Sequence, residues 1–293
     1  MPRTVAEGLT FLEGPRWHEG RLWMSDFFTG RVLAVDDEGR IEVIASLPGS
    51  MPSGLGWDTA GRLLVSSMVD RRLLRLTDGA FEEVADLSDL APWFINDMLV
   101  DPAGNAYVGQ FGWDDSQTPT ITPTTLLLIR PGGEVSVAAS GLVFPNGMAL
   151  ADEGRTLLVS ETFAGRISAF TRSADGTLSE RRVWAQFADR EFGSITEALQ
   201  SGVPLPDGLA IDAEGHVWMG DAAGRAAHRV SPGGEVVEQV EAGDGQSVFA
   251  VALGGADGRI LYMCAAEPYG KGDPSRRSVA RLLTERVTVP GVG

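Results

Sequence analysis

Four acids and amides stand beside similar turns at intervals along the chain: Glu13, Asn96, Asn146 and Asp207. Three of them are followed directly by glycine. Carboxylate and amide oxygens are hard ligands that suit Ca²⁺, Mg²⁺ or Mn²⁺. Any one of these residues could be an ordinary turn former, because Asn and Asp favour turns. Four of them at corresponding places in a repeat instead indicate a site for a divalent cation.

The repeat that carries these residues is best preserved at 206–220. A Pro-Asp-Gly turn is followed by a short apolar strand, a second turn at 213–215 and a second strand, which together predict a β-hairpin. Related stretches begin near residues 13, 52, 95, 145 and 248. Six copies at roughly 40–60 residue intervals, each with about four short strands, are typical of propeller blades.

The expected fold is therefore an all-β, six-bladed β-propeller that forms a single domain over residues 1–293. A propeller closes its sheets into a ring, so we expect strands near 4–12 and 280–289 to share a blade. The starts of the inner strands converge at one mouth of the channel, which would bring the four acids and amides together. We also expect a short helix at 195–200, and a long insert at 111–125 could lie over the pocket.

Composition excludes several classes of partner. The net charge of −16 (24 basic and 40 acidic residues) disfavours nucleic acid and anionic membranes and mildly favours a cation, although it also serves solubility. Cys264 is the single cysteine, so no intrachain disulfide can form, and no run reaches the ~20 apolar residues of a membrane span. We expect a soluble cytoplasmic protein, monomeric or weakly dimeric, that acts on a small molecule.

Other catalytic arrangements find little support in the sequence. His18 and His216 fall in or beside hairpin turns, and His228 is expected in a peripheral strand. No Gly-x-Ser-x-Gly segment is present, which disfavours a serine hydrolase. The glycine-rich turns lack the spacing of a phosphate-binding loop.

Several motifs together resemble the senescence marker protein (SMP-30)/gluconolactonase/luciferin-regenerating enzyme family. They are Glu13-Gly14-Pro15-Arg16-Trp17, Asn96-Asp97, Pro145-Asn146-Gly147, Pro206-Asp207-Gly208 and Val289-Pro290-Gly291. The resemblance implies a six-bladed propeller that binds one divalent metal ion and hydrolyses lactones. It implies Glu13, Asn146 and Asp207 as metal ligands, Asn96 as a substrate contact near the metal, and Asp207 as general base. Ca²⁺ is the favoured metal, with Zn²⁺, Mn²⁺, Mg²⁺ and Fe²⁺ as alternatives.

The expected chemistry is the opening of a cyclic ester. A divalent ion would polarise the lactone carbonyl and could lower the pKa of a bound water. Asp207 could take the proton from the attacking water, although a carboxylate that binds a cation is a weak base unless one oxygen stays free. Metal-bound hydroxide is therefore an equal alternative for the attacking group.

The chain departs from the sugar-lactone members of that family two residues before Asn96. Those members often carry an arginine there, whereas this chain has Phe94, preceded by Trp93. Further aromatic candidates for the pocket are Phe111, Trp113 and Phe163. Loss of a guanidinium and gain of aromatic surface predict a lactone or ester that is less polar than a sugar lactone. The same aromatics could equally belong to the propeller core.

Two other functions remain open from the sequence. The first is hydrolysis of phosphotriesters or activated esters, because the related diisopropyl fluorophosphatases share the metal ring. The second is a non-catalytic propeller that a metal ion stabilises and that serves as a binding protein.

Overall fold

A computed structural model describes residues 2–36, 38–114, 120–190, 192–268 and 277–292 and shows an all-β, propeller-like arrangement. Four sheets have four strands each. The first contains β2 (Leu12–His18), β3 (Arg21–Asp26), β4 (Arg31–Val35) and β5 (Ile41–Ser46). The second contains β6 (Pro52–Trp57), β7 (Leu63–Ser67), β8 (Arg72–Thr77) and β9 (Ala80–Asp86). The third contains β10 (Ile95–Val100), β11 (Ala106–Gln110), β12 (Thr124–Ile129) and β13 (Val135–Leu142). The fourth contains β14 (Pro145–Ala151), β15 (Thr156–Glu161), β16 (Arg166–Arg172) and β17 (Leu178–Gln186).

The remaining strands form one eight-stranded sheet, which differs from the expected six separate blades. It contains β18 (Pro206–Ile211), β19 (Val217–Asp221), β20 (Ala226–Val230), β21 (Val236–Glu241), β22 (Ser247–Gly254), β23 (Ile260–Ala266), β24 (Ala280–Arg286) and β1 (Arg3–Leu9). Its two halves are joined because Asp221 of β19 pairs with Val248 of β22.

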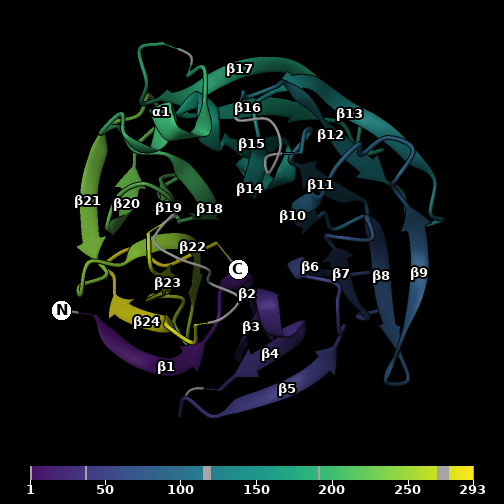
Figure 1. Cartoon of the computed structure of the whole chain (residues 1–293), viewed down its shortest axis with the longest axis horizontal. Coiled ribbons are helices and arrows are strands. Elements are labelled where there is room, and N and C mark those ends of the chain that lie inside the picture. Colours follow the sequence, from purple (N-terminus) through teal and green to yellow (C-terminus); the bar gives the residue numbers. More distant parts are fainter. Residues whose placement is uncertain (1, 37, 115–119, 191, 269–276, 293) are drawn as a thin grey trace.

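The strands that begin each repeat lie nearest the common axis of the molecule (Figure 1). These inner strands are β2, β6, β10, β14, β18 and β22, and the sheets extend outward from them. Strand β1 pairs antiparallel with β24, with Arg3 opposite Thr284 and Leu9 opposite Ala280. The prediction that strands from the two ends of the chain pair in one sheet is therefore confirmed.

Each inner strand carries a bulge or irregularity near its start. The register shifts between Glu13 and Arg16 in β2, and between Ile95 and Met98 in β10. Corresponding shifts occur in the other inner strands, at 52–55, 145–148, 206–209 and 248–250. A bulge re-aims side chains and strengthens the local twist. The same distortion thus recurs at each of the four predicted acids and amides, Glu13, Asn96, Asn146 and Asp207.

Glycines within the bulges let neighbouring inner strands approach closely. A Cβ atom on Gly147 would lie 2.3 Å from the carbonyl oxygen of Asp207. A Cβ on Gly208 would lie 2.6 Å from the Cα of Ala250. Both contacts involve backbone atoms that cannot move aside cheaply. The glycines therefore allow the narrow inner ring on which the site residues converge.

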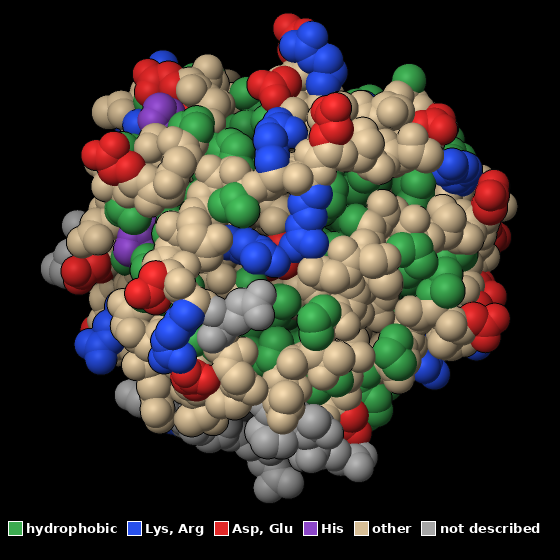
Figure 2. Space-filling view, turned by 90° about the horizontal axis from the view of Figure 1, so that it is seen from above, with side chains coloured by type: hydrophobic (Ala, Val, Ile, Leu, Met, Phe, Trp, Pro, Cys, Tyr) green, Lys and Arg blue, Asp and Glu red, His purple; other side chains and the backbone are tan. Residues whose placement is uncertain are grey.

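The hydrophobic core lies between adjacent sheets. Leu158 of β15 and Met219 of β19 belong to one buried cluster that joins the fourth sheet to the next. Helix is scarce: the predicted short helix is present as α1 (Ile195–Leu199), and 3₁₀ turns occur at η1 (Phe27–Thr29), η2 (Asp152–Gly154) and η3 (Thr162–Ala164). Among the described residues, no helix has the length and apolar character needed to span a bilayer. On the edge shown in Figure 2, acidic and basic side chains are intermixed.

Candidate active site

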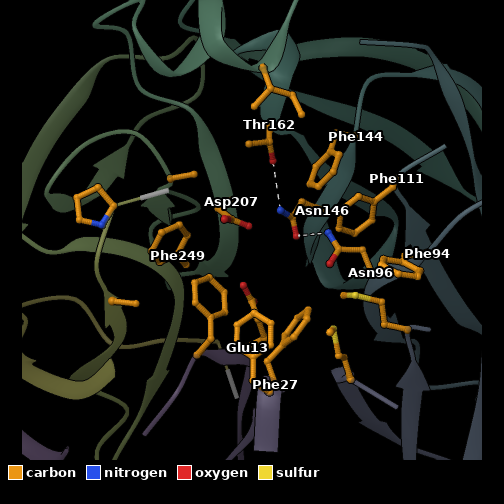
Figure 3. A pocket seen from close by; sticks show the side chains of 18 of the residues that line it. Glu13, Phe27, Phe94, Asn96, Phe111, Phe144, Asn146, Thr162, Asp207 and Phe249 are labelled. Carbon is orange, nitrogen blue, oxygen red and sulfur yellow. Dashed lines mark hydrogen bonds between the residues drawn. The ribbon is translucent and has the colours of Figure 1, made fainter. Parts of the chain in front are cut away.

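A pocket of about 470 Å³ opens at the end of the molecule where the inner strands begin. The four acids and amides that the repeat singled out all line it, and we call them the oxygen cluster: Glu13, Asn96, Asn146 and Asp207. They come from β2, β10, β14 and β18, so four sheets supply one side chain each. Figure 3 shows these side chains facing one another in the middle of the pocket.

The two amides of the oxygen cluster are held by a chain of hydrogen bonds. Asn96 Nδ2 donates to Asn146 Oδ1 at 2.9 Å, and Asn146 Nδ2 donates to Thr162 Oγ1 at 3.3 Å (Figure 3). Thr162 in turn donates to the carbonyl oxygen of Pro206 at 2.8 Å. The chain ends beside Asp207, so it fixes the orientation of both amides relative to that carboxylate.

The two carboxylates of the oxygen cluster are buried without a neutralising partner. Burial raises the pKa of Glu13 well above its usual value, and repulsion from Asp207 and Asp97 raises it further. Burial likewise raises the pKa of Asp207, with added repulsion from Asp97 and Asp221. Within the described part of the chain, neither carboxylate forms a salt bridge, and Asp207 Oδ1 is buried without a hydrogen-bond partner.

An ion pair lies next to this cluster. Arg16 of β2 contacts Asp97 Oδ1 with its Nη2 at 3.3 Å and donates to the carbonyl oxygen of Met98 at 2.6 Å. The guanidinium therefore bridges from the first sheet to the third and partly offsets the charge near Glu13.

The oxygen cluster fits a divalent cation. A cation would relieve the repulsion between Glu13 and Asp207, and Asp207 Oδ1 is a free buried ligand atom. The described residues contain no group of three or more His, Cys, Asp or Glu side chains placed for a metal ion. Two carboxylates supplemented by amide oxygens match a hard cation, whereas they lack the His and Cys ligands common in zinc sites.

Buried acids at the ends of second strands anchor the segments that lead into the cluster. Asp26 accepts hydrogen bonds from the N–H groups of residues 10 and 11, at 3.0 and 3.3 Å. Glu161 accepts from the N–H of Val143 at 2.8 Å, and Asp221 accepts from the N–H of Leu205 at 3.0 Å. Each anchored segment precedes Glu13, Asn146 or Asp207 by two or three residues. The acids therefore position the cluster through the backbone.

Above the cluster, the pocket is lined by two groups of phenylalanine rings. The Phe144 wall consists of Phe94, Phe111, Phe144 and Phe163. The Phe27 wall consists of Phe11, Phe27, Phe28 and Phe249. Figure 3 shows Phe94, Phe111 and Phe144 on one side of the oxygen cluster and Phe249 on the other. Within the walls, ring centroids lie 4.6 Å apart for Phe111 and Phe144, and 4.7 Å apart for Phe11 and Phe249.

The aromatic residues singled out from the sequence fall into two layers. Phe94, Phe111 and Phe163 line the pocket. Trp93 and Trp113 are absent from the lining: Trp93 stacks on Phe94 at 4.5 Å, and Trp113 packs edge-on against Phe144 at 6.0 Å. They support the wall from behind. The insert at 111–125 falls partly outside the described residues (115–119), so its expected place over the pocket is a proposal only.

Sequence reasoning missed the whole Phe27 wall, although a signal for part of it exists. Asp26 is followed by Phe27-Phe28-Thr29-Gly30, and Glu161 is followed by Thr162-Phe163-Ala164-Gly165. Both segments form a 3₁₀ turn that ends on a left-handed glycine. An acid, a short aromatic turn and a glycine at the same place in two repeats could have predicted both walls. Phe144 was also missed; its φ of 52° is unusual for a bulky residue.

The three histidines lie outside the pocket lining. His18 stacks on Trp57 with ring centroids 3.7 Å apart. His228 belongs to β20, the third strand from the axis in its half of the sheet, and its Nε2 lies 3.2 Å from Asp221 Oδ2. The closest link of a histidine to the oxygen cluster recorded in the described structure thus runs through Asp221.

Comparison with known proteins identifies the family to which this chain belongs. The model of the SMP-30/Gluconolactonase/LRE-like region matches residues 11–267. The pentonolactonase XacC of Haloferax volcanii is 27% identical over 292 residues, which cover 97% of this chain and 92% of that protein.

Solved structures share the fold. A luciferin-regenerating enzyme superposes with a TM-score of 0.80 at 18% identity, covering 100% of this chain and 98% of the other. Regucalcin from Agrobacterium tumefaciens strain C58, a calcium-binding protein, superposes with a TM-score of 0.78 at 20% identity, covering 100% and 95% of the two chains.

Proposed function

The chain belongs to the SMP-30/gluconolactonase/LRE-like family, and from this premise we propose that it is a metal-dependent hydrolase of lactones less polar than sugar lactones. The observation that carries the proposal is the oxygen cluster, in which two buried carboxylates without a cationic partner stand beside two oriented amides. A relative that spans nearly the whole chain is a pentonolactonase, which supports lactone hydrolysis as the reaction class.

The proposed metal ligands are Glu13, Asn146 and Asp207, with Asn96 beside them. Ca²⁺ is our choice, because the donors are oxygens and a protein of the same fold is a calcium-binding regucalcin. When bound, the cation would supply Lewis-acid polarisation of the lactone carbonyl. We assign the ordering of the amides to Thr162, whose hydroxyl accepts from Asn146.

The protein's own part in the reaction is to bind the lactone and move one proton. Water attacks the acyl carbon, and the carboxylate oxygen of Asp207 that does not hold the cation accepts the proton that the water loses. The ring C–O bond then breaks, the leaving alkoxide takes the proton, and a hydroxy acid results. Asn96 is positioned to contact the substrate. The phenylalanine walls exclude water and receive the apolar part of the lactone.

Three broader proposals complete this picture. We interpret the eight-stranded sheet as two blades joined by one residue pair, so that residues 1–293 form a single six-bladed propeller domain. With one cysteine, Cys264, which is free and buried, the chain suits a reducing cytoplasm. We also propose that it acts as a monomer or weak dimer.

The test is hydrolysis of a lactone panel by purified protein, followed by proton release, with a phosphotriester and an aryl ester measured in parallel. We expect lactones to be the best substrates, and we expect Asn146→Ala to abolish turnover with an unchanged far-ultraviolet circular dichroism spectrum. Faster turnover of the phosphotriester than of every lactone would replace this proposal with the phosphotriesterase hypothesis.

A further inference from the structure

The walls of the pocket present aromatic surface that none of the described residues covers fully. Phe144, Phe163 and Phe249 are buried, whereas five rings remain half-buried although they line the cavity: Phe11, Phe27, Phe28, Phe94 and Phe111. Half-buried rings from both walls therefore face the same enclosed space. A ligand placed between them would remove apolar surface of both walls from water.

The rest of the lining reinforces this apolar character. Met51 directly precedes β6 and Met68 directly follows β7, so both lie at the open end of that hairpin, and α1 contributes Ile195 and Leu199. Unbranched methionines adapt their shape and make favourable contacts with aromatic rings. Apart from the oxygen cluster, the described lining offers few polar side chains that could bind the hydroxyl groups of a sugar.

The ionisable groups of the lining are all acidic. Among the described lining residues they are Glu13, Asp207 and Glu267, and none is Lys, Arg or His. Glu267 pairs with Arg277, whose Nη1 lies 2.5 Å from Glu267 Oε2. The positive charge of the Arg277 guanidinium is therefore already balanced by Glu267. The two positive charges of a divalent cation would balance the negative charges of Glu13 and Asp207. No positive charge would then remain to pair with an anionic substituent. Burial of an unpaired carboxylate or sulfonate is costly.

We infer that the preferred substrate is an uncharged lactone with an aromatic substituent held between the Phe144 wall and the Phe27 wall, and that lactones with an anionic substituent are excluded. The inference rests on the lactonase activity proposed above. An aryl group suits the space because edge-to-face and offset pairs with phenylalanine add attraction beyond area burial. The existing pairs in both walls adopt such geometries, as Phe94 and Phe111 do at 5.9 Å and 83°.

The test compares three δ-lactones that differ only in one substituent: phenyl, 4-carbamoylphenyl and 4-carboxyphenyl. The last two have nearly the same shape and differ in charge. We expect kcat/KM to fall at least about tenfold from the carbamoyl to the carboxyl compound. Equal values for these two would overturn the inference while leaving the lactonase proposal intact.

Binding of the corresponding δ-lactams, which resist hydrolysis, separates the inference from the proposed activity. Calorimetry on metal-free protein should detect the phenyl and carbamoyl lactams and a much weaker carboxyl lactam. If the phenyl and carbamoyl lactams bind more tightly than the carboxyl lactam while no lactone is hydrolysed, the proposed lactonase function fails. The inference that the pocket binds uncharged aryl compounds would then still hold. If the carboxyl lactam binds as tightly as the carbamoyl lactam, the inference fails.

Two variants test whether the walls determine the selectivity for uncharged aromatic substituents. Phe28→Arg places a guanidinium in the Phe27 wall and should reduce the discrimination against the carboxyl compound by about tenfold. Phe111→Leu should lower the preference for phenyl over cyclohexyl lactone between about twofold and tenfold. Phe81→Leu, on the outer strand β9, is the matched control and should change neither ratio. Unaltered ratios in both pocket variants would contradict the inference.

Discussion

The oxygen cluster and the phenylalanine walls share one pocket but are built differently. Each cluster residue stands at the bulged start of an inner strand, where the repeat fixes its position. The wall residues other than Phe249, which lies in β22, instead come from connections between strands. Strand register thus positions the acids and amides that we propose for catalysis. The loops supply most of the aromatic surface that we propose for substrate selectivity. Changes in the two regions should therefore have separable effects.

The largest effect is expected from Asp207→Asn. Loss of the proton acceptor and of one ligand charge should lower kcat by about 10³-fold. The metal-free variant should melt at or above the wild-type temperature, because one of two buried, repelling carboxylates is gone. Turnover and calorimetric melting measure the two effects.

Asp212→Asn is the matched control for that prediction. Asp212 lies five residues further along, is buried and pairs with Arg229 at 2.7 Å, away from the pocket lining. It should lower stability and leave kcat nearly unchanged. A large loss of kcat in Asp212→Asn, or none in Asp207→Asn, would break the proposed separation between cluster and scaffold.

A smaller effect is expected from Glu161→Gln, which weakens the anchor of the Phe144 wall. Burial alone would raise the pKa of Glu161, but hydrogen bonds from Arg166 and Ser168 and the charge of Arg181 lower it below 4.5. The substitution should cost about 2 kcal/mol of unfolding free energy at neutral pH.

The difference in unfolding free energy between wild type and Glu161→Gln should depend on pH in a defined direction. A carboxylate whose folded pKa is depressed stabilises the protein above its unfolded pKa, and that contribution disappears as pH falls through the folded pKa. Urea denaturation should therefore show wild type and Glu161→Gln converging below pH 4.5. A gap that persists or widens in acid would mean that the charge of Glu161 is not the source of its stabilisation.

The smallest change is expected from Phe94→Arg, which alters the Phe144 wall without touching the cluster. A guanidinium two residues before Asn96 should shift relative kcat/KM toward polyol lactones by about tenfold. Phe94→Leu controls for loss of the ring alone. Unchanged relative rates in Phe94→Arg would show that Phe94 does not face the substrate.

The same division explains what the sequence could predict. The repeated acids and amides, three of them followed by glycine, predicted that Glu13, Asn96, Asn146 and Asp207 lie on corresponding strands, because register follows from the repeat. The joining of two half-sheets through Asp221 and Val248 could not be predicted, since it depends on how closely two neighbouring sheets approach. The layering of Trp93 behind Phe94 depends on side-chain packing between loops, which sequence spacing does not encode.

The most direct test of the central claim is lactone turnover by EDTA-treated protein before and after addition of Ca²⁺, Mg²⁺, Mn²⁺ or Zn²⁺. The account predicts that chelation abolishes hydrolysis, that a divalent cation restores it with apolar lactones turned over fastest, and that the Asp207→Asn protein stays inactive. Full hydrolysis by the metal-free wild-type protein, or no hydrolysis with any of the four metals, would contradict it.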